Sequence, residues 1–191
     1  MADAARKAAA ASPCIALLRG INVGKAKRVA MADLRQVIGE LGYGDVRTLL
    51  NSGNAVFSAP RARQQAAGAA IQEAMVVKLG VAARVTVIGA DELANIVAHN
   101  PLLDVATDMS RLFVYMVRDP QDLAPLGALA AQDWAPEVLA LGPRAAYLWC
   151  PHGVTDSRAA IALGKLLGDR VTARNWNTVC KLHAMCLEAP A

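Results

Sequence analysis

The chain has 191 residues and is 55% apolar, which suits one domain or two small ones and excludes a disordered chain. Its net charge of +4 allows an anionic ligand but is weaker than that of a dedicated nucleic-acid-binding tail. The four cysteines lack C-x-x-C or zinc-finger spacing, and no apolar run is long enough to span a bilayer. These features predict a cytoplasmic protein with no metal, no cofactor and no membrane contact.

The first half of the chain alternates the periodicities of strands and helices. Residues 1–12 are expected to form a flexible N-terminal tail. Apolar residues recur at i, i+3, i+4 and i+7 within 31–41, as on one face of a helix, and Asn51-Ser52-Gly53-Asn54 has the residue types of a hairpin turn. The predicted elements are a strand over 14–18, a helix over 31–41, strands over 46–50 and 55–57, a helix over 61–79 and a strand over 83–88.

The same order of elements returns after a short helix over 91–99 and a linker over 101–110. The second set is a strand over 111–117, a helix over 121–131, strands over 137–141 and 145–150, a helix over 157–167 and a short strand over 170–172. Each set has the order β-α-β-β-α-β, which is the ferredoxin-like pattern. We therefore predict an α+β protein with two ferredoxin-like halves, residues 13–100 and 101–191, and an additional C-terminal helix.

That last helix is predicted to run from about Arg174 to Leu187, with Thr172 as its N-terminal cap. The stripe expected to face inward consists of Trp176, Val179, Cys180, His183 and Leu187. A second face combines cations and amides near the helix N-terminus, where the macrodipole favours anions. This second face consists of Arg174, Asn177, Thr178 and Lys181.

A glycine-rich basic loop follows the first strand, with the sequence Gly20-Ile21-Asn22-Val23-Gly24-Lys25. It differs from the phosphate-binding P-loop, because its glycines are one residue too close and Ala26 replaces the magnesium-binding Ser or Thr. The backbone N–H groups of Gly20 and Gly24 could still form an anion nest. The surrounding cations are Arg19, Lys25, Lys27 and Arg28. A solvated basic loop is the alternative.

The predicted hairpin further along the chain carries Arg47 and Asn54, which stay open as ligand-binding residues, whereas Gly53 is expected to be an ordinary turn residue. The sequence does not determine whether the hairpin reaches the glycine-rich loop. Acid–base chemistry has little support, since none of the three histidines lies in the loop or the hairpin and no carboxylates cluster there. No catalytic residue is assigned.

Several segments resemble a known bacterial family, the domain of unknown function 1697. These segments are LLRGINVG, the helix start MADLR, VRT followed by SGN-V-F, and the terminal ARNWNTV-KL. The resemblance implies two ferredoxin-like halves and implies no reaction. The matching positions are Arg19, Gly20, Asn22, Gly24, Met31, Arg47, Ser52, Gly53, Asn54, Arg174, Asn175, Trp176, Asn177, Thr178 and Lys181. The chain departs from the family at Lys25, usually glycine, at Asn51, often glutamine, and at Ser157-Arg158-Ala159, usually Ser-Lys-Leu.

The sequence thus favours a protein that binds a small anionic or phosphate-bearing ligand through the loop and the C-terminal helix. The expected ligand-binding residues are Arg19, Gly20, Asn22, Gly24, Lys25, Arg47, Asn54, Arg174, Asn175, Asn177 and Lys181. Nucleic acid is a weaker candidate, because Phe57 alone offers a stacking surface on the strands of the first half. An enzyme acting on an anionic metabolite, or a structural or interaction protein without a ligand, are the alternatives. The oligomeric state is not indicated.

Overall fold

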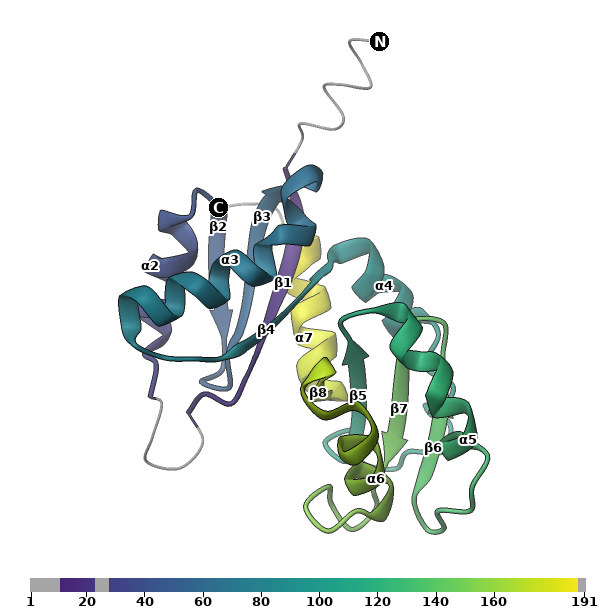
Figure 1. The fold of residues 1–191 in the computed structure, drawn as a ribbon. Coiled ribbons are helices and arrows are strands. Elements are labelled where there is room, and N and C mark those ends of the chain that lie inside the picture. Colours follow the sequence, from purple (N-terminus) through teal and green to yellow (C-terminus); the bar gives the residue numbers. More distant parts are fainter. Residues whose placement is uncertain (1–10, 23–27, 189–191) are drawn as a thin grey trace. The chain divides into compact units, whose positions relative to one another are not determined.

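The computed structural model describes residues 11–22 and 28–188 (Figure 1). It confirms the predicted α+β class: two four-stranded antiparallel sheets, each accompanied by helices, form two ferredoxin-like halves with an additional C-terminal helix. The chain divides into two compact units. One contains the chain up to Ala90 and the stretch from Ala184 onward, and the other is Asp91–His183. Each unit is described by itself.

The first unit is built on a sheet with the strand order β2-β3-β1-β4. Its strands are β1 (Ala11–Arg19), β2 (Gly44–Leu49), β3 (Asn54–Pro60) and β4 (Arg84–Gly89). All neighbours pair antiparallel, so β1 lies between β3 and β4. β1 begins within the stretch expected to be a tail, because Ala11 and Ser12 pair with Pro60 and Ala59.

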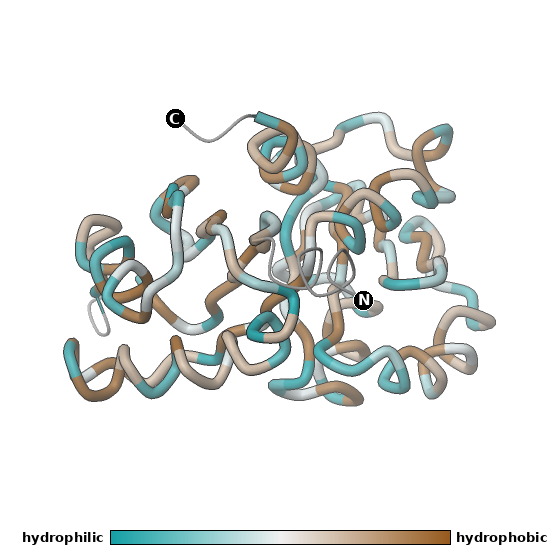
Figure 2. The backbone as a smooth tube through the Cα atoms, turned by 90° about the horizontal axis from the view of Figure 1, so that it is seen from above, coloured by the Kyte–Doolittle hydropathy of each residue, from teal (hydrophilic) through white to brown (hydrophobic). Residues whose placement is uncertain are grey.

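Helices α2 (Met31–Glu40) and α3 (Arg61–Leu79) cover one face of this sheet, as Figure 1 shows. The predicted apolar face of α2 is confirmed, since Leu34, Val37 and Ile38 are all buried. The helices carry hydrophobic and hydrophilic residues in turn along their length (Figure 2). Gly80 ends α3 in the left-handed conformation, with φ of 64°, which a glycine adopts without steric cost.

The second unit repeats the arrangement with the strand order β6-β7-β5-β8. Its strands are β5 (Leu112–Val117), β6 (Val138–Leu141), β7 (Ala145–Trp149) and β8 (Val171–Asn175). Helix α4 (Ala90–Ala98) precedes them, and α6 (Arg158–Leu167) packs its buried Ala159 and Leu163 into the core beside the sheet. The hydroxyl of Tyr147 in β7 donates to the carbonyl of Ile96 in α4 at 2.6 Å. This contact ties α4 to the second sheet, so the structural division falls near residue 90 and not at residue 100.

The helix predicted over 121–131 takes a different form. A 3-10 helix spans Pro120–Leu126, and only the short α5 (Gly127–Ala130) is α-helical. Pro125 explains the difference, because proline has no N–H to donate and its ring clashes with the preceding turn of an α-helix. Asp119 begins the segment by accepting a hydrogen bond from the Gln121 N–H at 3.0 Å.

The start of the C-terminal helix was also predicted wrongly. β8 continues through Asn175, and α7 spans Trp176–Leu187. The cap is Asn175, whose Oδ1 accepts from the Thr178 N–H at 3.0 Å and from the Thr178 hydroxyl at 2.7 Å. Thr172 is buried within β8, paired with β5, and is not a cap.

The buried stripe of α7 differs accordingly from the predicted one. The apolar residues that are buried in α7 are Trp176, Val179, Leu182 and Cys186. Cys180 and His183 are half-buried, and Leu187 is 74% exposed. The buried stripe therefore follows i, i+3, i+6 and i+10. Near the C-terminal end of α7 the buried residues, Leu182 and Cys186, lie one position before the predicted ones.

The N-terminus of α6 gives a testable prediction about stability. The Glu137 carboxylate accepts hydrogen bonds from the Ser157 hydroxyl at 2.9 Å, the Arg158 N–H at 3.1 Å and the Ala159 N–H at 2.9 Å. Charge-assisted bonds at a helix N-terminus are among the stronger ones, so Glu137→Ala should lower the free energy of unfolding by about 2–3 kcal/mol. Urea denaturation measures this, with the exposed Glu73→Ala as control. A loss below ~0.5 kcal/mol, the usual size for a surface substitution, would contradict the assignment.

Candidate functional site

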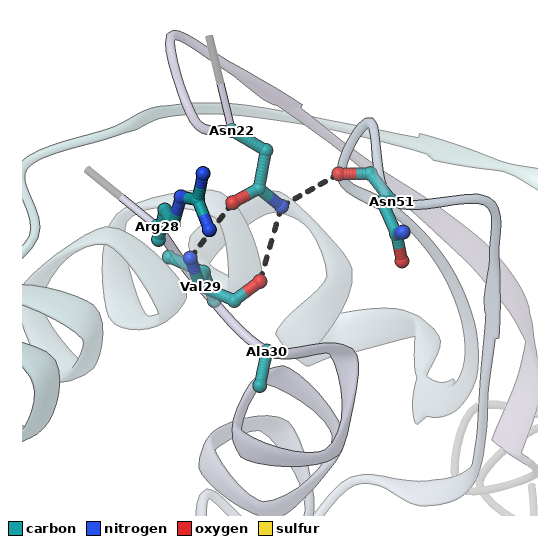
Figure 3. A pocket seen from close by; sticks show the side chains of 5 residues that line it. All are labelled: Asn22, Arg28, Val29, Ala30 and Asn51. Atoms are coloured by element: carbon teal, nitrogen blue, oxygen red, sulfur yellow. Dashed lines mark hydrogen bonds between the residues drawn. The ribbon is translucent and has the colours of Figure 1, made fainter. Parts of the chain in front are cut away.

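A pocket of about 450 Å³ lies in the first unit, beside the segment that leads from β1 into α2 and the turn between β2 and β3. Figure 3 shows the five described residues that line it: Asn22, Arg28, Val29, Ala30 and Asn51. Residues from two separate parts of the chain therefore meet here. The hairpin does reach the loop that follows β1, which the sequence left undetermined.

Asn22 joins these two parts through its side chain (Figure 3). Its Nδ2 donates to the Val29 carbonyl at 3.0 Å and to the Asn51 carbonyl at 2.6 Å, and its Oδ1 accepts from the Val29 N–H at 2.8 Å. Its backbone φ of 53° is left-handed, a conformation that asparagine tolerates better than most residues. Both amide hydrogens are engaged, so Asn22 shapes the pocket wall and has no further hydrogen to donate to a ligand.

Arg28 and Asn51 contribute the polar side chains that remain uncommitted. Both residues are exposed. Neither the Arg28 guanidinium nor the Asn51 side-chain amide makes a hydrogen bond or ion pair with any described residue. In Figure 3 they come from opposite sides of the pocket, Arg28 from the segment before α2 and Asn51 from the hairpin turn.

The N-terminus of α2 adds to the positive character of this pocket. Ala30 is the N-cap residue and lines the pocket, and no side chain caps the first turn of the helix. The first N–H groups of a helix lack intrahelical partners and carry a partial positive charge. Asp33, in the first turn, offsets part of that charge. Among the described residues that line the pocket, Arg28 carries the positively charged side chain.

Gly53 is a turn residue, as expected, and it also fixes the hairpin against β1. Its carbonyl accepts a hydrogen bond from the Leu18 N–H at 2.8 Å, and its φ is 79°. A Cβ at this position would lie 2.8 Å from both Leu18 Cβ and Ile21 Cδ1. The contact between the turn and β1 thus requires a residue without a side chain.

Asn54 and Arg47 are held by contacts within the first unit. Asn54 is fully buried, and its Nδ2 donates to the Leu49 carbonyl and the Ser52 hydroxyl, each at 2.9 Å, which braces the turn. Arg47 in β2 donates to the Glu188 carboxylate and to the Met185 carbonyl, each at 2.5 Å. Arg47 therefore holds the last turn of α7, where the carbonyl ends of the helix favour a cation.

Arg19 and Gly20 lie at the end of β1. Arg19 is exposed and pairs in register with Arg84 of β4, and Gly20, with φ of 82°, turns the chain out of the strand. The remaining expected loop residues, Gly24 and Lys25, lie outside the described residues.

The residues expected on one face of the C-terminal helix are divided between two elements in the second unit. Arg174 lies in β8, where its guanidinium donates to the Thr172 hydroxyl at 3.0 Å and the Ala173 carbonyl at 2.8 Å. Burial lowers the pKa of Arg174 to about 10, which still leaves it charged at neutral pH. Asn175 caps α7, and Asn177 and Lys181 are exposed on that helix. Arg174 therefore does not share a helix face with Asn177 and Lys181.

Metal and thiol chemistry have no support in the described part of the chain. Within residues 11–22 and 28–188, no three His, Cys, Asp or Glu side chains gather in a way that could hold a metal ion. Burial raises the pKa of Cys14 to about 12 and those of Cys150 and Cys186 to about 11, so these thiols stay protonated at neutral pH. None of the helices described is both long and apolar enough to cross a bilayer.

The residues that line the pocket were only partly identified from sequence. Arg28 was one of four cations around the loop, and Asn51 was noted as a departure from a glutamine. The signal for Asn51 was its place in the turn next to Ser52-Gly53, but sequence spacing does not reveal that its carbonyl meets Asn22, 29 positions away. Whether a hairpin turn contacts a distant loop is decided by the tertiary structure.

Comparison with known proteins gives a family and a fold. The family described as "Protein of unknown function (DUF1697)" matches residues 12–147. No curated protein sequence matches the chain. Among solved structures, the conserved bacterial protein SP0830 from Streptococcus pneumoniae is similar, with a TM-score of 0.76 and 22% identity over 93% of this chain and 99% of its own. At that identity the likeness shows the fold alone.

Proposed function

The chain belongs to the family DUF1697, whose description assigns no function, and on the geometry of the first unit we propose that it binds a small phosphate-bearing anion. The site is the pocket lined by Asn22, Arg28, Val29, Ala30 and Asn51. The four cysteines are all free, which supports a cytoplasmic location for this binding protein.

The observation that carries the proposal is the state of Arg28. Its guanidinium lines a pocket of about 450 Å³ and is not committed to any described carboxylate or carbonyl. A guanidinium offers five N–H donors in a planar fork that matches phosphate oxygens. The uncapped first turn of α2, which begins at the same pocket, favours the same charge.

Binding has more support than catalysis. The five described lining residues are two asparagines, one arginine and two small apolar residues, so none of them can act as a general acid or base near neutral pH. An enzyme would need that group from its substrate or from a residue beyond this lining. The pocket alone therefore supports recognition of an anion.

A prediction follows for Arg28. Because a hydrogen bond to a charged group contributes roughly 1.5–3 kcal/mol, Arg28→Ala should weaken phosphate binding by about 10- to 150-fold. Titration calorimetry with inorganic phosphate, or the thermal shift it produces, measures the loss. Lys165→Ala is the matched control, because it removes one positive charge from an exposed site in the second unit. Equal losses in the two variants would mean that only net charge matters.

A second candidate, a structural or interaction protein without a ligand, is favoured by a different observation. Three residues expected to bind a ligand are engaged within the fold. Arg47 of β2 bonds to the C-terminal end of α7, Asn54 braces the hairpin turn, and Asn175 caps α7. If no anion changes the melting temperature of the wild-type chain, this candidate replaces the first.

A further inference from the structure

We propose that the outer edge of strand β6 is a self-association surface, on which β6 of one molecule pairs antiparallel with β6 of a second copy. β6 is an outer strand of its four-stranded sheet and is bonded to β7 on one side (Figure 1). The pairing would join the two copies of this sheet into one continuous sheet. The surface belongs to the second unit, whereas the anion pocket belongs to the first.

Two residues of β6 present backbone groups on the open side of the strand. The ladder with β7 begins where the Gly142 N–H donates to the Ala145 carbonyl at 2.9 Å. Along an antiparallel ladder, residues that bond to the neighbouring strand alternate with residues that point away from it. Leu139 and Leu141 therefore direct their N–H and C=O groups away from β7, and no described residue hydrogen-bonds to these groups.

The other outer strands carry features that protect a sheet edge, and β6 differs from them. The Val85 N–H of β4 donates to the Gln72 side chain at 2.8 Å, and the Ala173 carbonyl of β8 accepts from the Arg174 guanidinium at 2.8 Å. β2 is interrupted by a bulge near its start. Bulges, charged side chains and covering groups are the usual means of preventing edge-to-edge pairing. β6, in contrast, pairs in a continuous register and consists of apolar residues alone.

The sequence of β6 is complementary to itself when a two-fold axis passes through Ala140. Leu139 then lies opposite Leu141 of the second copy, and the outward N–H and C=O groups of each such pair exchange two hydrogen bonds. Ala140 faces its own counterpart with about 4.5–5.5 Å between the Cβ atoms, a distance that its small side chain tolerates. On either side of these pairs, Val138 meets Gly142, which has no side chain to clash. A second copy therefore fits this edge.

The length of the strand limits the strength of the association. Pro143 follows the hairpin turn and has no N–H to donate, and the Glu137 carboxylate at the other end is bonded to the N-terminus of α6. The pairing is therefore confined to the few residues of β6, a contact smaller than the 1,200–2,000 Å² or so that stable complexes bury. We expect a weak dimer, with a dissociation constant of about 0.1–1 mM.

The test is sedimentation velocity of the full chain, combined with hydrogen exchange, at concentrations from about 10 µM to about 1 mM. The chain should change from monomer to dimer over this range. Exchange at the Leu139 and Leu141 N–H groups should become slower, whereas exchange at the Val85 N–H, which is already bonded to Gln72, should not change. A chain that remains monomeric at ~1 mM would overturn the proposal. A dimer in which exchange at Leu139 and Leu141 is unaltered would place the contact elsewhere and would overturn it as well.

Two charged variants of Ala140 examine the two-fold register directly. Ala140→Lys and Ala140→Glu each place like charges opposite one another at the axis, so each variant alone should stay monomeric. An equal mixture of the two should associate, because lysine then faces glutamate. Ala69→Lys, which adds the same charge at an exposed position of α3, is the matched control and should dimerise as the wild type does. Association that persists in the separate Ala140 variants, or that is lost in Ala69→Lys, contradicts the proposed contact.

Leu141→Pro provides the same test if a charge at position 140 prevents folding. Proline removes an N–H that points away from β7, so the ladder within the sheet is kept, as in natural edge strands. The dimer loses one hydrogen bond from each of its two symmetric pairs, which should weaken association by about 10- to 100-fold. Circular dichroism verifies that the variant is folded. Association of folded Leu141→Pro with the wild-type dissociation constant would rule out pairing through β6.

Discussion

Asn22→Ala is expected to lower the free energy of unfolding by about 3 kcal/mol and to abolish anion binding in the pocket. The variant loses three hydrogen bonds, to Val29 N–H, Val29 C=O and Asn51 C=O, each worth about 0.5–1.5 kcal/mol. An alanine held at the observed φ of 53° would cost a further ~1 kcal/mol. These bonds hold the backbone of Val29, the residue that follows Arg28, and so help to position the Arg28 side chain. The affinity for phosphate should therefore fall together with the stability.

The measurements for Asn22 are chemical denaturation and phosphate titration on two variants. Asn22→Gly accepts the left-handed backbone and loses only the side-chain bonds, so it should be about 1 kcal/mol more stable than Asn22→Ala and bind phosphate as poorly. If Asn22→Gly binds phosphate as well as the wild type does, the three hydrogen bonds of the Asn22 side chain are not what shapes the pocket. A stability within ~0.5 kcal/mol of wild type for Asn22→Ala would show that the bonds contribute nothing.

Gly53→Ala should destabilise the first unit by about 2–4 kcal/mol. The added Cβ would lie 2.8 Å from Leu18 Cβ and 2.8 Å from Ile21 Cδ1, closer than such atoms can approach. Forcing a methyl group into a packed site costs ~1–3 kcal/mol, and a left-handed φ adds about 1–2 kcal/mol for a residue with a Cβ. Relief of the clash would displace the turn that carries Asn51, so phosphate binding should weaken as well.

A matched glycine substitution makes this test specific. Gly39 lies in α2 with open space around the position of a Cβ, so Gly39→Ala should stabilise the same unit by about 0.5–1 kcal/mol through helix propensity. Urea denaturation of both variants measures the difference. Similar stabilities for Gly53→Ala and Gly39→Ala would refute the close approach of the hairpin to β1.

The regular elements could be predicted because their hydrophobic periodicity is local. The apolar positions of α2 and the glycine that ends α3 were recognised, and both are confirmed. Where a proline interrupts the pattern, at Pro125, local composition suggested a helix that the backbone cannot form. The order of strands and helices was enough to give the fold class.

The parts that could not be predicted depend on long-range pairing. The residues around Arg174 are of types common at the start of a helix, so a helix was predicted to begin there. The pairing of Arg174 with Val114 of β5 instead keeps it in a strand. Likewise, Thr172 and Asn175 are both common cap residues, and the same pairing leaves only Asn175 at the helix start. In the pocket, the bond between Asn22 and Asn51 spans 29 positions and has no local signature. Local rules identify residue types that can form such contacts, but not their partners.

The contact of Arg47 with the last turn of α7 has a consequence for synthesis on the ribosome. Glu188 follows Arg47 by 141 positions and Met185 follows it by 138, yet all three belong to the first unit. At a translation rate of about 5–20 residues per second, that separation corresponds to roughly 7–28 s. The strands of the first unit are therefore synthesised well before Met185 and Glu188, and Arg47 can form these hydrogen bonds only after those residues have emerged. A nascent chain stalled before residue 184 should expose this strand to proteases and chaperones that the complete chain resists.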